Sequence, residues 1–98
     1  MTPRSLLEPE AEAEFLEAMG WYEERRVGLG AAFRASVEAT LELVEESPQR
    51  YPVALRDIRK ARVARFPYVI YYVILPRAIS VIAIIHGRRD PKRWQRRR

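Results

Sequence analysis

From residue 66 to residue 86 the chain reads FPYVIYYVIL-PR-AISVIAIIH, two apolar runs joined by Pro76-Arg77. β-Branched and aromatic side chains fit the pleated surface of a sheet, and a proline between two such runs is typical of a turn. The two runs therefore predict a β-hairpin, with one strand from Phe66 to Leu75 and the other from Ala78 to His86. The rest of the fold must cover the apolar faces of this hairpin.

The second strand of the hairpin is apolar on both faces. Strict alternation divides it into two sets, one of Ile79, Val81, Ala83 and Ile85, the other of Ser80, Ile82, Ile84 and His86. Antiparallel sheets usually leave one face to water. We therefore expect a cover for the second face, which is either a partner protein or the C-terminal segment of the chain itself, with Trp94 against the sheet.

Two amphipathic helices are predicted upstream of the hairpin. The first spans Pro9 to Arg26 and the second about Leu29 to Glu46, with Gly28 as a left-handed stop between them. Each has an apolar stripe at helical spacing. The stripes consist of Ala11, Phe15, Ala18 and Tyr22 in the first helix and Phe33, Val37, Leu41 and Val44 in the second. The short connection makes the pair an αα-hairpin.

The expected architecture is a single α+β domain over residues 1–98. An N-terminal αα-hairpin (about 9–46) packs on a three- to four-stranded twisted antiparallel sheet (about 56–86), and a short basic segment (87–98) follows. The run from Asp57 to Val63 mixes basic and apolar residues. Such a mixture favours an outer strand, where charge discourages pairing with another chain.

The charge of the chain is divided between its two halves. Residues 1–50 contain eleven Glu and five Arg, a net charge of −6, whereas residues 51–98 contain thirteen Lys and Arg and two Asp, a net charge of +11. Seven of these cations stand among the last thirteen residues. Such a surface favours anionic partners, among them nucleic acid, the ribosome and acidic protein segments.

Composition excludes several classes of protein. The chain has no cysteine and one histidine, so it forms no disulfide or thiolate metal site, and we expect neither a metal nor a cofactor. Met1 to Glu8 contain no apolar core of a signal peptide. The longest uncharged apolar run, from Phe66 to Leu75, is shorter than the roughly 20 residues of a membrane helix. We therefore expect a soluble cytoplasmic protein without membrane contact.

Five short motifs, taken together, resemble a known family. They are Trp21-Tyr22-Glu23, Gly28-Leu29-Gly30 with Phe33, Pro48-Gln49-Arg50-Tyr51-Pro52, Phe66-Pro67-Tyr68, and His86-Gly87-Arg88-Arg89-Asp90-Pro91. In this order and spacing, over nearly the whole chain, the sequence resembles the RelE/ParE superfamily of toxins from bacterial type II toxin–antitoxin modules, nearer the ParE-like branch. The resemblance implies two N-terminal helices on a twisted antiparallel sheet. It also implies a cognate antitoxin that wraps the toxin in a hetero-oligomer.

The resemblance implies more than one function. ParE-like toxins inhibit growth by poisoning DNA gyrase, in modules associated with plasmid stabilisation, whereas RelE-like toxins cut messenger RNA in the ribosome. The fold does not decide between these targets. We expect a ParE-like toxin that binds DNA gyrase without catalysis of its own. The alternatives are a RelE-like ribosome-dependent endoribonuclease and a degenerate toxin that only binds its antitoxin.

A ribonuclease needs a proton-transfer group and fixed positive charge at the phosphate. His86 is the only side chain of a type that exchanges protons near neutral pH, and Arg62, Arg65 and Arg88 are the candidate phosphate contacts. RelE-like nucleases generally carry further basic and tyrosine or histidine groups at the extreme C-terminus. Here that end reads Trp94-Gln95-Arg96-Arg97-Arg98, and this departure favours a binder over an enzyme.

Two further sets of residues are candidates for protein contacts. The gyrase target is expected to meet the basic segment at Arg88, Arg89, Lys92, Arg93 and Trp94. The antitoxin is expected to meet the apolar sheet face at Tyr68, Ile70, Tyr72, Ile82 and Ile84.

Overall fold

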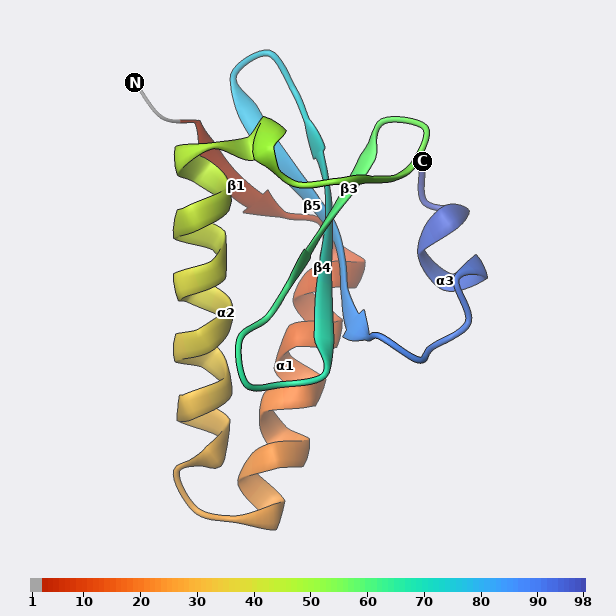
Figure 1. The fold of residues 1–98 in the computed structure, drawn as a ribbon. Coiled ribbons are helices and arrows are strands. Elements are labelled where there is room, and N and C mark those ends of the chain that lie inside the picture. The colour runs from red at the N-terminus through yellow and green to blue at the C-terminus, as the bar shows by residue number, and fades with distance from the viewer. Residues whose placement is uncertain (1–2) are drawn as a thin grey trace.

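The computed structural model describes residues 3–98, so residues 1 and 2 of the expected 1–98 domain lie outside the described range. Along the chain the elements are β1 (Arg4–Leu7), α1 (Pro9–Arg25), α2 (Leu29–Glu46), the short 3-10 helix η1 (Pro48–Arg50), β2 (Val53–Leu55), β3 (Ile58–Arg62), β4 (Tyr68–Ile74), β5 (Ala78–His86) and α3 (Lys92–Gln95). The strands form one sheet in the order β1-β5-β4-β3-β2. The long helices α1 and α2 cover one face of this sheet, and α3 lies on the opposite side (Figure 1). The expected α+β architecture is confirmed.

α1 and α2 pack closely at the short connection between them. Gly28 adopts a φ of 90°, as expected for the stop between the helices. The Glu23 carboxylate of α1 accepts hydrogen bonds from the backbone N–H groups of Gly28 and Gly30, at 2.9 and 3.0 Å. It thereby satisfies donors that the first turn of α2 cannot pair internally. A Cβ atom at Gly30 would lie 2.7 Å from the Met19 carbonyl oxygen, so glycine permits this close approach.

The strands β4 and β5 form the predicted hairpin, but one bulge changes its faces. Tyr71 pairs with Ala83, while the next residue, Tyr72, pairs with Val81, so that Ile82 is extra. Beyond the bulge the faces of β5 exchange, and Ile84 joins the helix-side core. The strict alternation expected from the sequence is therefore wrong beyond Val81. Ile82, Ala83 and Ile85 all belong to the second apolar cluster, on the other face.

Two short strands extend the sheet at its edges. β1 runs parallel to β5, from Arg4 opposite Ala78 to Leu7 opposite Val81. β2 pairs with β3 on the other edge, with Val53 opposite Arg59. The expectation that the basic run around Ile58–Arg62 is an outer strand is wrong, because β2 lies outside it. The sheet is consequently mixed and has five strands.

The C-terminal segment covers the face of the sheet that α1 and α2 leave open. The Trp94 side chain is only 5% exposed and stacks on Tyr71, with ring centroids 4.1 Å apart and an interplanar angle of 15°. It packs in one apolar cluster with Ile58, Val73 and Ile82. The sequence left two possible covers for this face, a partner protein or the C-terminal segment. In the structure the C-terminal segment covers it. This packing places α3, which carries Lys92 and Arg93, beside the sheet (Figure 1).

Candidate functional site

A cleft of about 410 Å³ lies between α1, the start of β4, the end of β5 and the segment that leads into α3. Aromatic rings and charged groups share its walls. The principal lining side chains are Glu14, Glu17, Trp21, Tyr22, Tyr68, His86, Arg89 and Arg93. Residues from four separate parts of the sequence thus meet here, and the cleft offers both an apolar surface and charges of both signs.

His86 lies in this cleft at the last position of β5. Its Nδ1 atom accepts a hydrogen bond from the backbone N–H of Arg88 at 3.1 Å. Its ring meets that of Tyr68 edge to face, with centroids 5.7 Å apart. Because Nδ1 is the acceptor, the neutral imidazole carries its proton on Nε2. The free nitrogen of His86 is therefore a donor in the neutral side chain.

Tyr68 is the phenol closest to His86 in this cleft. Its ring packs against Tyr22 and Phe33, with centroids 6.0 and 5.0 Å away. Burial raises the pKa of the Tyr68 hydroxyl, and the nearby Arg89 charge offsets part of this rise. The hydroxyl is therefore protonated at neutral pH and can donate a hydrogen bond to a bound group.

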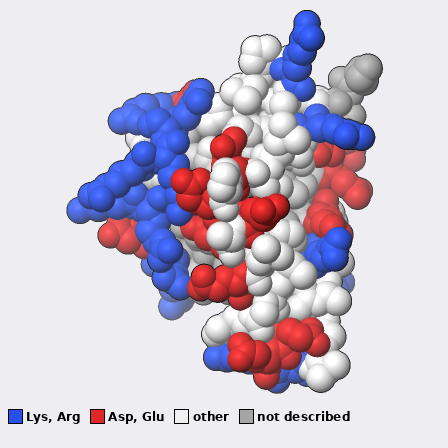
Figure 2. All heavy atoms as spheres, turned by 180° about the vertical axis from the view of Figure 1, so that it is seen from behind, with Lys and Arg blue, Asp and Glu red and all other residues white. Residues whose placement is uncertain are grey.

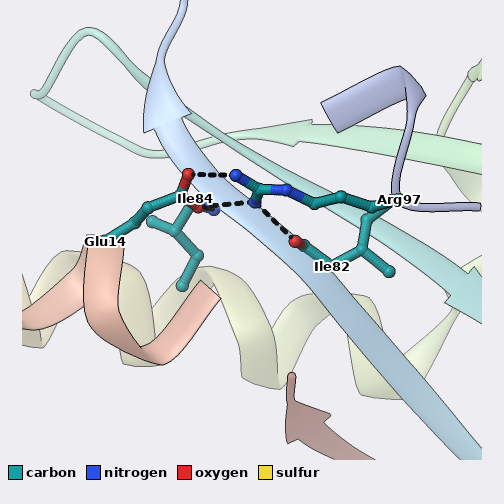
Figure 3. A network of polar contacts seen from close by, with 4 residues as sticks. All are labelled: Glu14, Ile82, Ile84 and Arg97. Atoms are coloured by element: carbon teal, nitrogen blue, oxygen red, sulfur yellow. Dashed lines mark hydrogen bonds and ion pairs between the residues drawn. The ribbon is translucent and has the colours of Figure 1, made fainter. Parts of the chain in front are cut away.

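Glu14 and Arg97 form an ion pair across β5, beside the cleft (Figure 3). The two guanidinium nitrogens of Arg97 donate to the two carboxylate oxygens of Glu14 at 3.0 and 2.8 Å. Arg97 Nη1 also donates to the Ile82 carbonyl at 2.9 Å, and the Ile84 N–H donates to Glu14 at 3.1 Å. Hydrogen bonding to Glu14 raises the pKa of Arg97, so the arginine stays charged.

This ion pair completes the edge of β5 where a strand is missing. β1 pairs with β5 only as far as Val81, and buried backbone groups without partners are costly. Arg97 supplies the donor for the carbonyl of Ile82, and Glu14 supplies the acceptor for the N–H of Ile84. Sequence reasoning missed this contact. The two residues are 83 positions apart, and neither belongs to a recognisable local pattern.

The other candidate catalytic residues do not join His86 in the cleft. Arg62 is the last residue of β3 and is exposed. Arg65 lies in the turn between β3 and β4 with a φ of 71°, and Arg88 is exposed after β5. None of the three lines the cleft, whereas Arg89 and Arg93 do. In the cleft, the cations that accompany His86 are therefore Arg89 and Arg93 instead of the three that the sequence suggested.

The candidate target-binding residues separate into exposed cations and one buried ring. Arg88, Arg89, Lys92 and Arg93 are exposed. Trp94 is not, because its ring is packed on Tyr71. The stacking surface of Trp94 is therefore used inside the fold.

Four of the five candidate antitoxin-binding residues are buried in the folded chain. Ile70, Tyr72 and Ile84 lie in the core beneath α1 and α2. Ile82 is buried on the other face with Trp94. Only Tyr68 is partly exposed, and it opens into the cleft. The expectation assumed strict alternation and an open sheet face, and the bulge together with the C-terminal segment removes both conditions.

Positive and negative side chains lie on different parts of the surface. Figure 2 shows Lys and Arg gathered on the side of the molecule that carries α3, next to a band of Asp and Glu over α1. Among residues 3–98, no group of three or more His, Asp or Glu side chains is placed to hold a metal ion. In the same described range, no helix is long and apolar enough to cross a membrane.

Comparisons with known proteins agree with this architecture. A family model described as the ParE toxin of the type II toxin–antitoxin system parDE matches residues 6–91. Among solved structures, a chain of the "Chromosomal ParDE TA system from P. aeruginosa" superposes with a TM-score of 0.70 at 13% sequence identity. That alignment covers 87% of this chain and 96% of the other, and it shows a shared fold. The comparison with curated protein sequences found no match.

Proposed function

Because the chain belongs to the ParE toxin family of type II toxin–antitoxin systems, we propose that it inhibits growth by binding DNA gyrase in the cytoplasm. In this proposal the toxin performs no chemistry of its own, and a cognate antitoxin neutralises it by forming a hetero-oligomer with it.

The hydrogen bond between the Arg88 N–H and His86 Nδ1 is the observation that supports binding over catalysis. A histidine that acts as a base through Nε2 must carry its proton on Nδ1. Here Nδ1 faces the Arg88 N–H. A proton on Nδ1 would therefore place two hydrogen-bond donors opposite each other. The cations Arg62 and Arg65 also lie outside the cleft that contains His86. This arrangement suits recognition better than RNA cleavage.

The gyrase contact in this proposal uses the exposed cations that follow β5. Arg88, Arg89, Lys92 and Arg93 stand on a segment that the packing of Trp94 holds against the sheet. Holding the backbone of this segment in place before binding reduces the entropy lost on association. Trp94 thus contributes by positioning its neighbours, whereas the four cations make the contacts.

The antitoxin contact in this proposal uses the cleft between α1 and β5. Tyr68 opens into it, and Trp21, which is 48% exposed, stands on its rim. Tryptophan and tyrosine side chains are frequent hot spots of protein interfaces. Trp21→Ala should weaken antitoxin binding at least tenfold in isothermal titration. Leu43→Ala is the matched control, because Leu43 is equally exposed on α2 and does not line the cleft.

The gyrase assay uses purified toxin, gyrase and supercoiled plasmid. The expected result is accumulation of cleaved gyrase–DNA complexes, which persists with His86→Gln and declines when Arg88 and Arg89 are both changed to Ala. Antitoxin added in equal amount should suppress the effect. Site-specific cuts in translated messenger RNA that vanish with His86→Gln would instead establish the ribonuclease alternative. Antitoxin binding without either activity would identify a degenerate toxin.

A further inference from the structure

A second hollow of about 440 Å³ lies where the β2–β3 turn meets α3. Four of its six lining residues are cations, and they come from opposite ends of the second half of the sequence. The lining consists of Leu55, Arg56, Lys92, Gln95, Arg96 and Arg98. Figure 2 shows the gathering of Lys and Arg on this side of the molecule. We call Arg56, Lys92, Arg96 and Arg98 the turn–α3 basic patch.

Arg56 occupies a backbone position that does not suit arginine. Its φ is 50°, in the left-handed region where a side chain with a Cβ atom costs free energy that glycine does not. Arg56 and Asp57 alone connect Leu55 to Ile58 in this turn, the type of connection in which glycine and asparagine are favoured. A charged side chain kept at a strained position points to a role for that side chain.

Few negative charges oppose the turn–α3 basic patch. Asp57 pairs with Arg98 at 2.8 Å, and both side chains are about half exposed. Asp90 accepts the backbone N–H of Lys92 at 3.0 Å. The guanidinium of Arg56 donates a long hydrogen bond to the backbone oxygen of Arg98, at 3.4 Å. The patch therefore keeps a positive excess, and an anion can compete for Arg98 at an exposed and weak ion pair.

The composition of the patch indicates which anionic partner it fits. Protein interfaces concentrate their binding energy in aromatic and apolar side chains at the centre, and the hollow has only Leu55 to offer. Single-stranded nucleic acid is held by stacking on aromatic rings. The lining of the hollow includes no aromatic residue, and the ring that α3 carries, Trp94, is buried against Tyr71. Guanidinium and ammonium groups without an aromatic ring for base stacking suit the regularly spaced phosphates of a duplex backbone.

We propose that the turn–α3 basic patch binds the phosphodiester backbone of a nucleic-acid duplex, without reading its sequence. Guanidinium groups bind phosphate oxygens through paired hydrogen bonds. Four cations around one hollow give up to four phosphate contacts. Duplex DNA and duplex RNA share this chemistry. The inference goes beyond the proposed function, because it concerns nucleic acid in the absence of gyrase and stands whether or not gyrase is the target.

The test measures fluorescence anisotropy of a labelled 20-base-pair duplex with the purified toxin, in parallel for DNA and RNA of the same sequence and over a range of salt concentrations. With four contacts, the plot of log affinity against log salt for DNA should have a slope of about −3.6. Arg56→Gly should make that slope shallower by about 1 and weaken binding about twofold to fivefold at low salt. Asp57→Asn should tighten binding, because it frees Arg98.

The control is Arg65→Gly, which makes the same charge change at the other left-handed arginine, at the opposite end of β3. Both glycine variants relieve backbone strain, so thermal melts should show neither to be destabilised and a folding defect cannot explain lost binding. A loss of affinity with Arg56→Gly but not with Arg65→Gly supports the patch. Equal losses, a slope near zero, or competition by poly-glutamate as strong as by duplex would overturn the inference. A higher affinity for one of the two duplexes identifies whether the patch favours DNA or RNA.

Discussion

Arg97→Ala tests the ion pair that completes the edge of β5. Glu14 and Arg97 are 13% and 18% exposed, and the substitution leaves the Glu14 carboxylate with the Ile84 N–H as its remaining partner in Figure 3. It also removes the donor from the Ile82 carbonyl. Removing one partner of a buried pair costs about 3 to 5 kcal/mol. Because both side chains keep some access to water, the expected loss is about 3 kcal/mol, a large share of the roughly 5 to 15 kcal/mol typical of a domain.

Urea unfolding followed by circular dichroism measures this loss. The matched control is Arg98→Ala, which removes the neighbouring arginine from an exposed pair with Asp57 and should leave the urea midpoint almost unchanged. Glu14→Gln should reduce the damage caused by Arg97→Ala, because no unpaired charge then remains at the edge of β5. A double-mutant cycle should give a coupling free energy of about 1 to 3 kcal/mol between the two positions.

Light scattering provides a second readout for the same variant. Without Arg97, the edge of β5 beyond Val81 loses the side chain that satisfies its backbone, and exposed strand edges promote association between chains. Arg97→Ala should therefore form oligomers at concentrations where Arg98→Ala stays monodisperse. A free-energy loss below about 1 kcal/mol, additive with that of Glu14→Gln, would refute the assignment of this pair as the completion of the edge.

Three further predictions concern the core. Gly30→Ala should destabilise the protein by about 1 to 3 kcal/mol in urea melts, because the added Cβ would lie 2.7 Å from the Met19 carbonyl oxygen; Gly20→Ala, with open space around its Cβ, should stabilise it by about 0.5 to 1 kcal/mol. Phe33→Ala should cost about 3 to 5 kcal/mol, since Phe33 is fully buried, and a loss under about 1 kcal/mol would mean that this helix face is not in the core. Burial raises the pKa of Tyr72 from 10.0 to about 12, so its contribution to stability is present below pH 10 and lost as pH rises toward 12. Between melts at pH 9 and pH 11, Tyr72→Phe should therefore lose less stability than the unsubstituted protein. An equal loss of stability in the two proteins would contradict the assignment.

The sequence by itself determined the two helices and the central hairpin. α2 begins at Leu29 and ends at Glu46, as the apolar stripe predicted, and α1 ends one residue before the predicted boundary. The hairpin of β4 and β5 follows from two apolar runs and a Pro76-Arg77 turn. These elements are long enough to repeat their period several times, so local residues specify them without reference to distant ones.

The edges of the sheet were decided by tertiary structure. β1 and β2 have four and three residues, too few to display a period. β1 exists because β5 offers it a parallel partner, and β2 because β3 turns back on it. For the same reason the sequence alone placed β3 at the outside of the sheet. A strand of this length is stabilised by pairing, and pairing is a property of the whole fold.

The candidate sites, too, were predictable from the sequence only in part. Sequence reasoning singled out His86, and the cations after it, from residue type alone. Only the folded chain shows that His86 Nδ1 accepts the Arg88 N–H, that a bulge at Ile82 turns Ile84 toward the helices, and that Trp94 is used inside the fold. The sequence fixes which chemical groups are available. Their partners depend on contacts between residues far apart in the chain, as with Glu14 and Arg97, and such contacts form only when the layers pack.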